Sequence, residues 1–190
     1  MDGSDGREAE DTGPTVLHVL VPYDPRWRDL FRSAAAQLHE LGNAVWVIEH
    51  IGSTAVPGMT AKPVIDLAVR VDDERDYRRH RPGLERGGWR AGSSVRSHPV
   101  MVREVEGTRA HIAHFFDSAQ WPEVNQRLFR DWLLSHPLDA RRYEDAKRRA
   151  AVATSSGRVA YNEGKTAFVQ EIVDRARSER GLPAVNVSDK

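Results

Sequence analysis

The sequence predicts an α+β domain in which a small β-sheet is followed by a helical C-terminal part. Two apolar stretches, 44–51 and 64–71, predict strands, and the second alternates between core-type and other residues. Two more strands, 99–106 and 109–116, form a predicted hairpin about Gly107-Thr108, which gives a sheet of four or five strands. Apolar residues at helical spacing dominate the last third of the chain, which predicts helices there.

Three further features complete the expected order of elements. Asp24-Pro25 is a good helix start and Gly42 a good helix end, so a core helix is expected between them. The charged segment 72–81 predicts a solvated helix that ends at Pro82. The C-terminal helices are expected at 124–133, 138–153 and 159–180.

The length of 190 residues suits one domain, which we place at 15–180. Residues 1–14 lack large apolar side chains and predict a disordered tail, and 181–190 predict a polar C-terminal tail. The 28 basic and 28 acidic residues balance, so no general nucleic-acid binding is expected. The absence of cysteine excludes disulfides and thiolate metal sites.

Neither a membrane-spanning segment nor a secretory signal is expected. No apolar run approaches the roughly 18 residues that span a bilayer, so no membrane interaction is expected. The acidic N-terminus does not resemble a secretory signal, and we therefore expect a cytoplasmic protein. The oligomeric state is left open.

The main candidate site lies between the first two strands. The first strand ends on Gly52-Ser53, where backbone N–H groups and a hydroxyl can bind a phosphate; the alternative is a simple turn capped by Ser53. Alternation places Asp66 on the face of the second strand that need not be packed. A carboxylate in an apolar strand is costly unless it is paired or functional. Asp66 is therefore a candidate Mg²⁺ ligand or general base, the alternative being a pair with Lys62 or Arg70.

This stretch, GSTAVPGMTAKPVID from Gly52 to Asp66, preceded by Glu49-His50, closely resembles the signature of the GrpB family, which has a nucleotidyltransferase-like fold. FRDWL at 129–133 and two Tyr-x-x-x-Lys pairs, at 143/147 and 161/165, resemble that family as well. The resemblance implies a small mixed sheet flanked by helices. It also implies a small phosphorylated ligand, with ATP or another nucleoside triphosphate as substrate and Mg²⁺ as cofactor.

The resemblance assigns roles to several residues. Gly52, Ser53 and Thr54 would hold phosphates, and Asp66 would be the catalytic residue and metal ligand. Active nucleotidyltransferases carry two carboxylates two residues apart on one strand, and Ala68 stands at the second position here. The missing carboxylate would have to come from Glu49, Glu104 or Glu106.

Basic residues supply the rest of the predicted phosphate site. Lys165 shares an apolar helix face with Tyr161, and Lys147 repeats this pattern on the preceding helix. A lysine on a packed face snorkels, pairs with a carboxylate or lines an anion pocket, and two near the corner favour the pocket. Lys62 and Arg130 join the set; their alternatives are a solvated lysine and a surface ion pair with Asp131.

The histidines are weaker candidates. His50 precedes the corner, and His111 and His114 lie on the later strand, where residues three apart face opposite ways. Only one of that pair can reach the site, and we favour His114. These residues allow a hypothesis of a metal-dependent hydrolase built from His50, Asp66 and His114, which is weaker than the two hypotheses that follow.

The leading hypothesis is an enzyme that binds a nucleoside triphosphate with Mg²⁺ and transfers a nucleotidyl group or activates a substrate by adenylation. The alternative is a non-catalytic module that binds a nucleotide or a phosphorylated metabolite. Ala68 favours the alternative because it cannot ligate a second metal ion.

Overall fold

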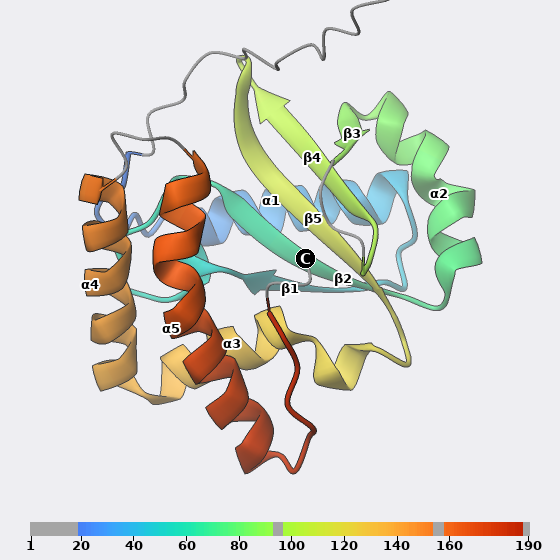
Figure 1. Cartoon of the computed structure of the whole chain (residues 1–190). Coiled ribbons are helices and arrows are strands. Elements are labelled where there is room, and N and C mark those ends of the chain that lie inside the picture. The colour runs from blue at the N-terminus through green and yellow to red at the C-terminus, as the bar shows by residue number, and fades with distance from the viewer. Residues whose placement is uncertain (1–18, 93–96, 154–157, 188–190) are drawn as a thin grey trace, which may run out of the picture.

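The computed structural model describes residues 19–92, 97–153 and 158–187, without the side chains of 152–153 and 158–165. The N-terminal tail predicted at 1–14 lies outside these residues. In chain order the longer elements are α1 (Trp27–Leu41), β1 (Val47–Ile51), β2 (Ile65–Val71), α2 (Glu74–Arg86), β3 (Trp89–Ala91), β4 (Val100–Val105), β5 (Thr108–Asp117), α3 (Asn125–Ser135), α4 (Pro137–Ala153) and α5 (Arg158–Glu179) (Figure 1). Two short 3₁₀ helices, η1 (Ser53–Ala55) and η2 (Trp121–Glu123), follow β1 and β5.

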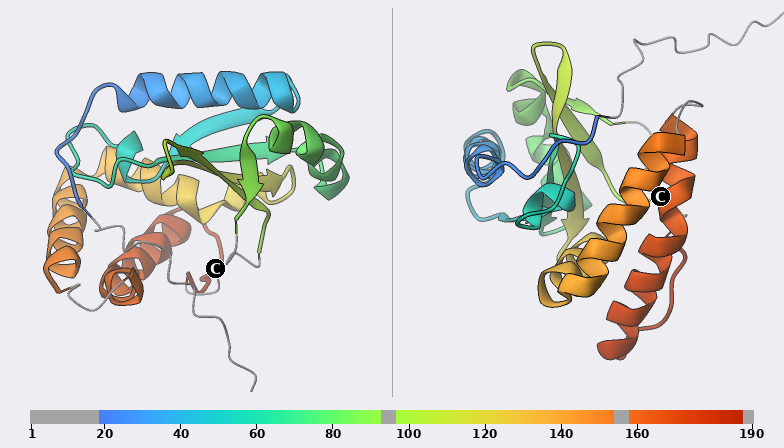
Figure 2. Two further views of the ribbon diagram at one scale, coloured as in Figure 1. Left: turned by 90° about the horizontal axis from the view of Figure 1, so that it is seen from above. Right: turned by 90° about the vertical axis from the view of Figure 1, so that its left-hand side faces the viewer.

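The described strands form one mixed sheet in the order β1-β2-β5-β4-β3. Strands β2 and β5 pair in parallel, whereas the other neighbours pair antiparallel. Helices α1 and α2 cover one face and α3, α4 and α5 lie on the other, as the two turned views show (Figure 2). The predicted α+β architecture, with a small mixed sheet flanked by helices and a helical C-terminal part, is confirmed.

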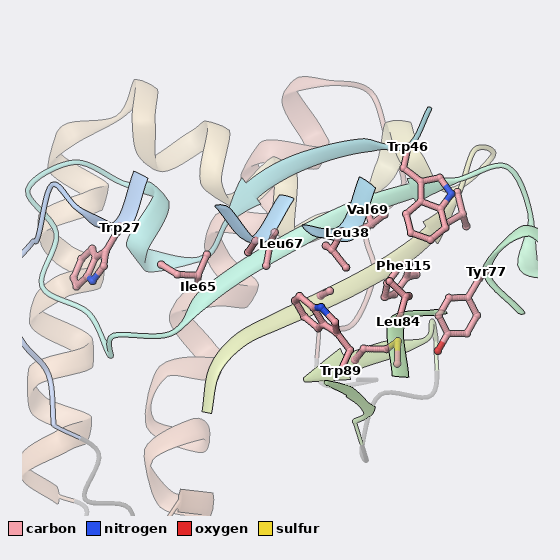
Figure 3. Close-up of a cluster of buried hydrophobic side chains, with 14 of the residues drawn as sticks. Trp27, Leu38, Trp46, Ile65, Leu67, Val69, Tyr77, Leu84, Trp89 and Phe115 are labelled. Atoms are coloured by element: carbon pink, nitrogen blue, oxygen red, sulfur yellow. The ribbon is translucent and has the colours of Figure 1, made fainter. Parts of the chain in front are cut away.

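Strand β2 supplies side chains to both layers. Ile65, Leu67, Val69 and Val71 are each at most 3% exposed and pack against α1 and α2 in an apolar core that includes several aromatic rings (Figure 3). Asp66 and Ala68 point to the opposite face, toward the C-terminal helices. The alternation predicted for 64–71 is confirmed, because residues i and i+2 of a strand share a face.

Two helix boundaries differ from the sequence prediction. Helix α1 begins at Trp27, and Asp24 caps the preceding turn by accepting a hydrogen bond from the Arg26 amide (2.9 Å). Helix α2 continues through Pro82 to Arg86 instead of ending there. The proline removes one helical donor, but the buried Tyr77 and Leu84 on either side pack into the core, and packing outweighs that loss.

The C-terminal helices enclose a second apolar cluster with the loop after β1, and the chain after α5 joins it. Leu182, Val185 and Val187 pack there, although the sequence predicts a polar tail from 181. Gln170 holds this segment: its side chain donates to the Val185 carbonyl and accepts from the Val187 amide, both at 2.8 Å. Within the described ranges, no helix is long and apolar enough to cross a membrane.

Candidate functional site

The end of β1 and the start of β2 meet at the predicted corner. Ile51 pairs with Asp66 in the sheet, and Gly52 follows with φ of 72°, a conformation that side chains other than hydrogen disfavour. A Cβ placed on Gly52 would lie 2.4 Å from Oδ2 of Asp66. The Asp66 carboxylate therefore lies directly against the glycine, and this position requires Gly for both its backbone and its space.

The corner opens into a cavity of about 730 Å³ between the sheet and the C-terminal helices. Gly52, Ser53 and Asp66 line one end, and Val169, Val173 and residues 185–187 line the wall formed by α5 and the chain after it. Phe116 and Phe129 add aromatic surface. The structure thus brings the corner and Asp66 together in front of a helical wall, as the sequence predicts.

Tyr143 of α4 reaches this corner and is a residue that sequence reasoning missed. Burial raises its pKa to about 12, with a hydrogen bond to Ser53 lowering it and the charge of Asp66 raising it. The phenol therefore stays protonated over the physiological pH range and lies beside both residues. The Tyr-x-x-x-Lys pattern was the only signal for it, and that pattern directed attention to the lysine.

The lysine of that pattern has a different position from the one predicted. Lys147 is 2% exposed, and its ammonium donates to the Thr60 carbonyl in the loop between η1 and β2. Glu144 accepts from the Thr60 amide (3.0 Å), and Arg148 donates to the Thr60 hydroxyl (3.2 Å). Helix α4 thereby holds the loop of the signature in place, and Lys147 is not among the residues that line the cavity.

The other predicted phosphate-binding residues divide in the same way. Thr54 is 3% exposed and donates to the Val64 carbonyl (3.3 Å), which is a structural role. Lys62 is half-buried in the loop before β2 and does not line the cavity. The side chains of Tyr161 and Lys165 lie outside the described residues, although the α5 backbone passes through both positions.

Arg130 belongs to an ion-pair cluster beside β1. It donates to Glu49 (2.7 Å), to the His50 carbonyl (2.8 Å) and to Asp131. Arg127 also donates to Glu49, at 2.7 and 3.1 Å. Burial raises the pKa of Glu49, but the hydrogen bonds and charges of the two arginines outweigh it and leave the pKa below its usual value.

Glu49 therefore forms salt bridges with both Arg127 and Arg130. It pairs with Ala68 in the sheet, and so sits beside the position of the missing carboxylate, but its oxygens are turned to the guanidinium groups. Glu104 pairs with Arg90 (3.4 Å), and Glu106 occupies the hairpin turn. None of the three lines the cavity, so none supplies a second carboxylate there.

The histidines are separated by the sheet. The His50 ring stacks on Phe31, with ring centres 4.8 Å apart, and bonds to the Thr54 hydroxyl on the α1 side. Burial, and then the charge of Arg130, lower the pKa of His50 to about 4. His114 lies on the cavity side, so the combination of His50, Asp66 and His114 into one metal centre is wrong.

His114 has a partner that sequence reasoning missed. Its Nδ1 lies 2.9 Å from Nε2 of His98, a residue just before β4 that is 8% exposed and lines the same cavity. His111 points to the opposite face, where it is buried near Trp89. The preference for His114 over His111 as a residue of the cavity side agrees with this placement.

The corner offers a Mg²⁺ ion one carboxylate, that of Asp66. Over the described part of the chain, no three His, Asp or Glu side chains gather closely enough to hold a metal ion. Mg²⁺ is commonly held by one or two carboxylates together with substrate phosphates and water. Asp66 meets that requirement in the presence of a phosphate ligand, whereas a two-metal centre does not fit, because the buried Ala68 replaces the second carboxylate.

The charge of the described lining is negative. Three carboxylates, those of Asp66, Asp117 and Glu123, line the cavity together with one guanidinium, that of Arg177. Arg177 is already engaged by Glu123 (2.9 Å) and Asn125 (2.9 Å). An anionic ligand would therefore need a bound cation to offset these charges.

Comparison with known proteins agrees with this structure. Residues 18–175 match the family described as GrpB protein. The chain belongs to the GrpB family. Among GrpB relatives, a UPF0157 protein of Halalkalibacterium halodurans is 35% identical over 84% of this chain and 83% of its own length. A UPF0157 protein of Pseudomonas aeruginosa is 35% identical over 95% of this chain and 76% of its own length.

A solved structure of a GrpB protein has a similar fold. The crystal structure of the conserved protein GrpB from Enterococcus faecalis has a TM-score of 0.76 and 26% identity, covering 86% of this chain and 99% of that one. A more distant likeness is terminal uridylyl transferase 4 from Trypanosoma brucei with bound dUTP. Its TM-score is 0.48 and its identity 11%, over 86% of this chain and 57% of that chain.

Proposed function

We propose that this GrpB protein binds a nucleoside triphosphate as its Mg²⁺ complex in the cavity and transfers the nucleotidyl group to a small acceptor. The observation that carries the proposal is the close approach of Asp66 to Gly52 in the lining of a cavity of about 730 Å³. A glycine at that point lets a phosphate approach the backbone, and an adjacent carboxylate can hold the metal that accompanies it.

Each corner residue has a stated task in this proposal. The Gly52-Ser53 backbone and the Ser53 hydroxyl would contact the phosphates, and Tyr143, which bonds Ser53, would orient that hydroxyl. Asp66 would hold Mg²⁺. When bound, that ion would supply charge neutralisation for phosphoryl chemistry.

A second candidate is the non-catalytic binding module. Ala68 is fully buried, and Glu49, its neighbour in the sheet, is held by Arg127 and Arg130. A site with one carboxylate has no second metal to activate an acceptor hydroxyl. This observation favours binding without transfer, and the two candidates differ only in turnover.

Calorimetry with ATP, in the presence and absence of Mg²⁺, tests the shared part of both candidates. We expect binding that requires Mg²⁺ and that weakens at least about 10-fold in Asp66→Asn, because the amide cannot replace a metal-binding carboxylate. Asp117→Asn is the matched control, since it removes a carboxylate of the same cavity that lies away from the corner. Equal binding by both variants would contradict the proposed position of the metal.

Pyrophosphate release separates the two candidates. The wild-type protein is incubated with Mg²⁺ and each nucleoside triphosphate, with pooled small hydroxyl and amine compounds as acceptors. Release that disappears in Asp66→Asn supports the enzyme. Tight, Mg²⁺-dependent binding without release supports the module, and no binding in any condition removes both.

A further inference from the structure

We propose that His98 and His114 form a binding site for a divalent transition-metal ion, held by imidazole nitrogens and not by the Asp66 carboxylate. The proposal rests on the geometry of the two imidazoles and does not depend on nucleotide binding. Their facing nitrogens, Nε2 of His98 and Nδ1 of His114, are 2.9 Å apart in the wall of the cavity. The histidines share a hydrogen bond there. Metal binding would need the shared proton to move to the other nitrogen of the ring that carries it, so that both rings stay neutral and both facing nitrogens have a lone pair for the ion.

The separation of the nitrogens suits a metal ion that prefers imidazole. Two nitrogen ligands about 2.1 Å from one ion lie about 3.0 Å apart at right angles and about 3.4 Å apart in a tetrahedron. The observed 2.9 Å is close to the first value and needs a shift of a few tenths of an ångström to reach the second. Zn²⁺, Co²⁺ and Ni²⁺ accept imidazole, whereas Mg²⁺ prefers oxygen.

The surroundings hold both rings in place. Ser97 Oγ lies 2.9 Å from Nδ1 of His98, which leaves Nε2 directed at His114. Metal-binding histidines commonly use the other ring nitrogen in such a bond, which fixes the tautomer and the ring orientation. Phe116 packs on His98 with ring centres 4.2 Å apart, and the Phe115 amide donates to the Pro99 carbonyl (2.9 Å), which anchors the backbone beside His98.

The site would be open rather than closed. Two side chains would occupy two positions of the ion, and water or a ligand in the cavity would fill the others, which is one protein ligand fewer than catalytic zinc sites have. The ion would bring positive charge to a cavity whose described lining has three carboxylates and one guanidinium, that of Arg177, which already binds Glu123. Sequence spacing gives no sign of the pair, because 15 residues and a strand lie between the two histidines.

The test uses the full chain after dialysis against a chelator, without nucleotide. Co²⁺ is titrated by visible absorption and Zn²⁺ by calorimetry, with Mg²⁺ as a competitor. We expect one ion per chain that Mg²⁺ does not displace, and an affinity at least about 10-fold lower in His98→Gln and in His114→Gln. His136→Gln is the control, because that ring stacks on Trp132 outside the cavity.

Thermal unfolding provides a second measurement on the same proteins. An ion that binds only the folded chain raises its melting temperature, so Zn²⁺ should raise that of the wild type and of His136→Gln but not that of either cavity variant. Unchanged Co²⁺ affinity in a His98→Gln/His114→Gln double variant, or equal competition by Mg²⁺, would overturn the proposal. Because nucleotide is absent throughout, these results are independent of the ATP experiments.

Discussion

The two faces of the sheet use the same strands for different purposes. Against α1 and α2, β2 and β5 present Leu67, Val69 and Phe115, and the layer between is filled with apolar side chains. Against the C-terminal helices, the same strands present Asp66 and His114 to a cavity. Adjacent residues of one strand thus have different surroundings: one packs in the apolar core and the next lines the cavity. Substitutions at the two positions should therefore affect stability and ligand binding separately.

Substitutions of the adjacent residues Leu67 and Asp66 test this difference between the two faces most directly. Leu67→Ala removes a side chain with no exposed surface, and we expect the free energy of unfolding to fall by about 2–5 kcal/mol. Asp66→Asn should change it far less while weakening Mg²⁺-dependent ATP binding at least about 10-fold. Urea unfolding of both variants checks the first effect. A loss as large in Asp66→Asn as in Leu67→Ala would mean that the cavity face also carries the stability.

Gly52 tests the cavity face directly. In Gly52→Ala the new Cβ meets Asp66 at 2.4 Å, on a backbone whose φ of 72° already disfavours alanine. We expect about 1–3 kcal/mol of destabilisation and a displaced carboxylate, so ATP binding should weaken together with stability. Gly58→Ala is the control, since it has a φ of 79° but nothing within 4 Å of its Cβ. Equal ATP affinity in both variants would contradict the proposed use of the corner.

Lys147 distinguishes a structural lysine from an anion-binding one. Lys147→Met keeps an unbranched side chain but leaves the Thr60 carbonyl without its ammonium donor, so we expect a loss of about 1–2 kcal/mol in unfolding free energy. If the ammonium served the phosphates instead, stability would hold and ATP affinity would fall steeply. Urea unfolding and calorimetry on the same preparation separate these outcomes.

The last expected effect is a pH dependence that belongs to the packed face. The pKa of His50 is about 4 in the folded protein, because burial and then the charge of Arg130 lower it from the ordinary value of 6.5 that applies in the unfolded chain. The unfolded chain therefore takes up the proton first. His50 contributes stability above pH 6.5, and that contribution is lost as the pH falls toward 4.

Substitution isolates the contribution of this ring. After discounting for partial exposure, we expect His50→Gln to remove up to about 2 kcal/mol of the stability difference between pH 7 and pH 4.5. His111, whose pKa is also lowered by burial and by Arg103, should account for a further part, and His111→Gln is the comparison. An unchanged pH profile in His50→Gln would show that the imidazole is solvated.

More of the packed face than of the cavity face could be predicted from the sequence. The alternation in β2 assigned Leu67 and Asp66 to opposite sides because strand geometry follows from local spacing. Its main error on the packed side, the helix end at Pro82, came from ranking a local rule above the burial of Tyr77 and Leu84. Local patterns predict faces well when one face is continuously apolar.

The cavity depends on partners that local spacing cannot provide. Tyr143 meets Ser53 across 90 positions, and His98 meets His114 across an intervening strand. The Lys147 ammonium lay on the expected helix, but its acceptor is a loop carbonyl, which no side-chain pattern encodes. The corner itself was predictable because Gly52 and Asp66 flank one short connection.

The packing of residues 182–187 against Gln170 and Arg177 has a consequence for biosynthesis. Arg177 donates to the Pro183 carbonyl, and Val187 lines the cavity together with Ile51 of β1, a strand translated far earlier. In Figure 1 this red segment returns from the end of α5 toward the sheet. While residues 182–187 are still inside the ribosomal exit tunnel, the nascent chain therefore has its strands already made and the cavity still lacks one side. The cavity wall should be complete only after this segment has left the tunnel.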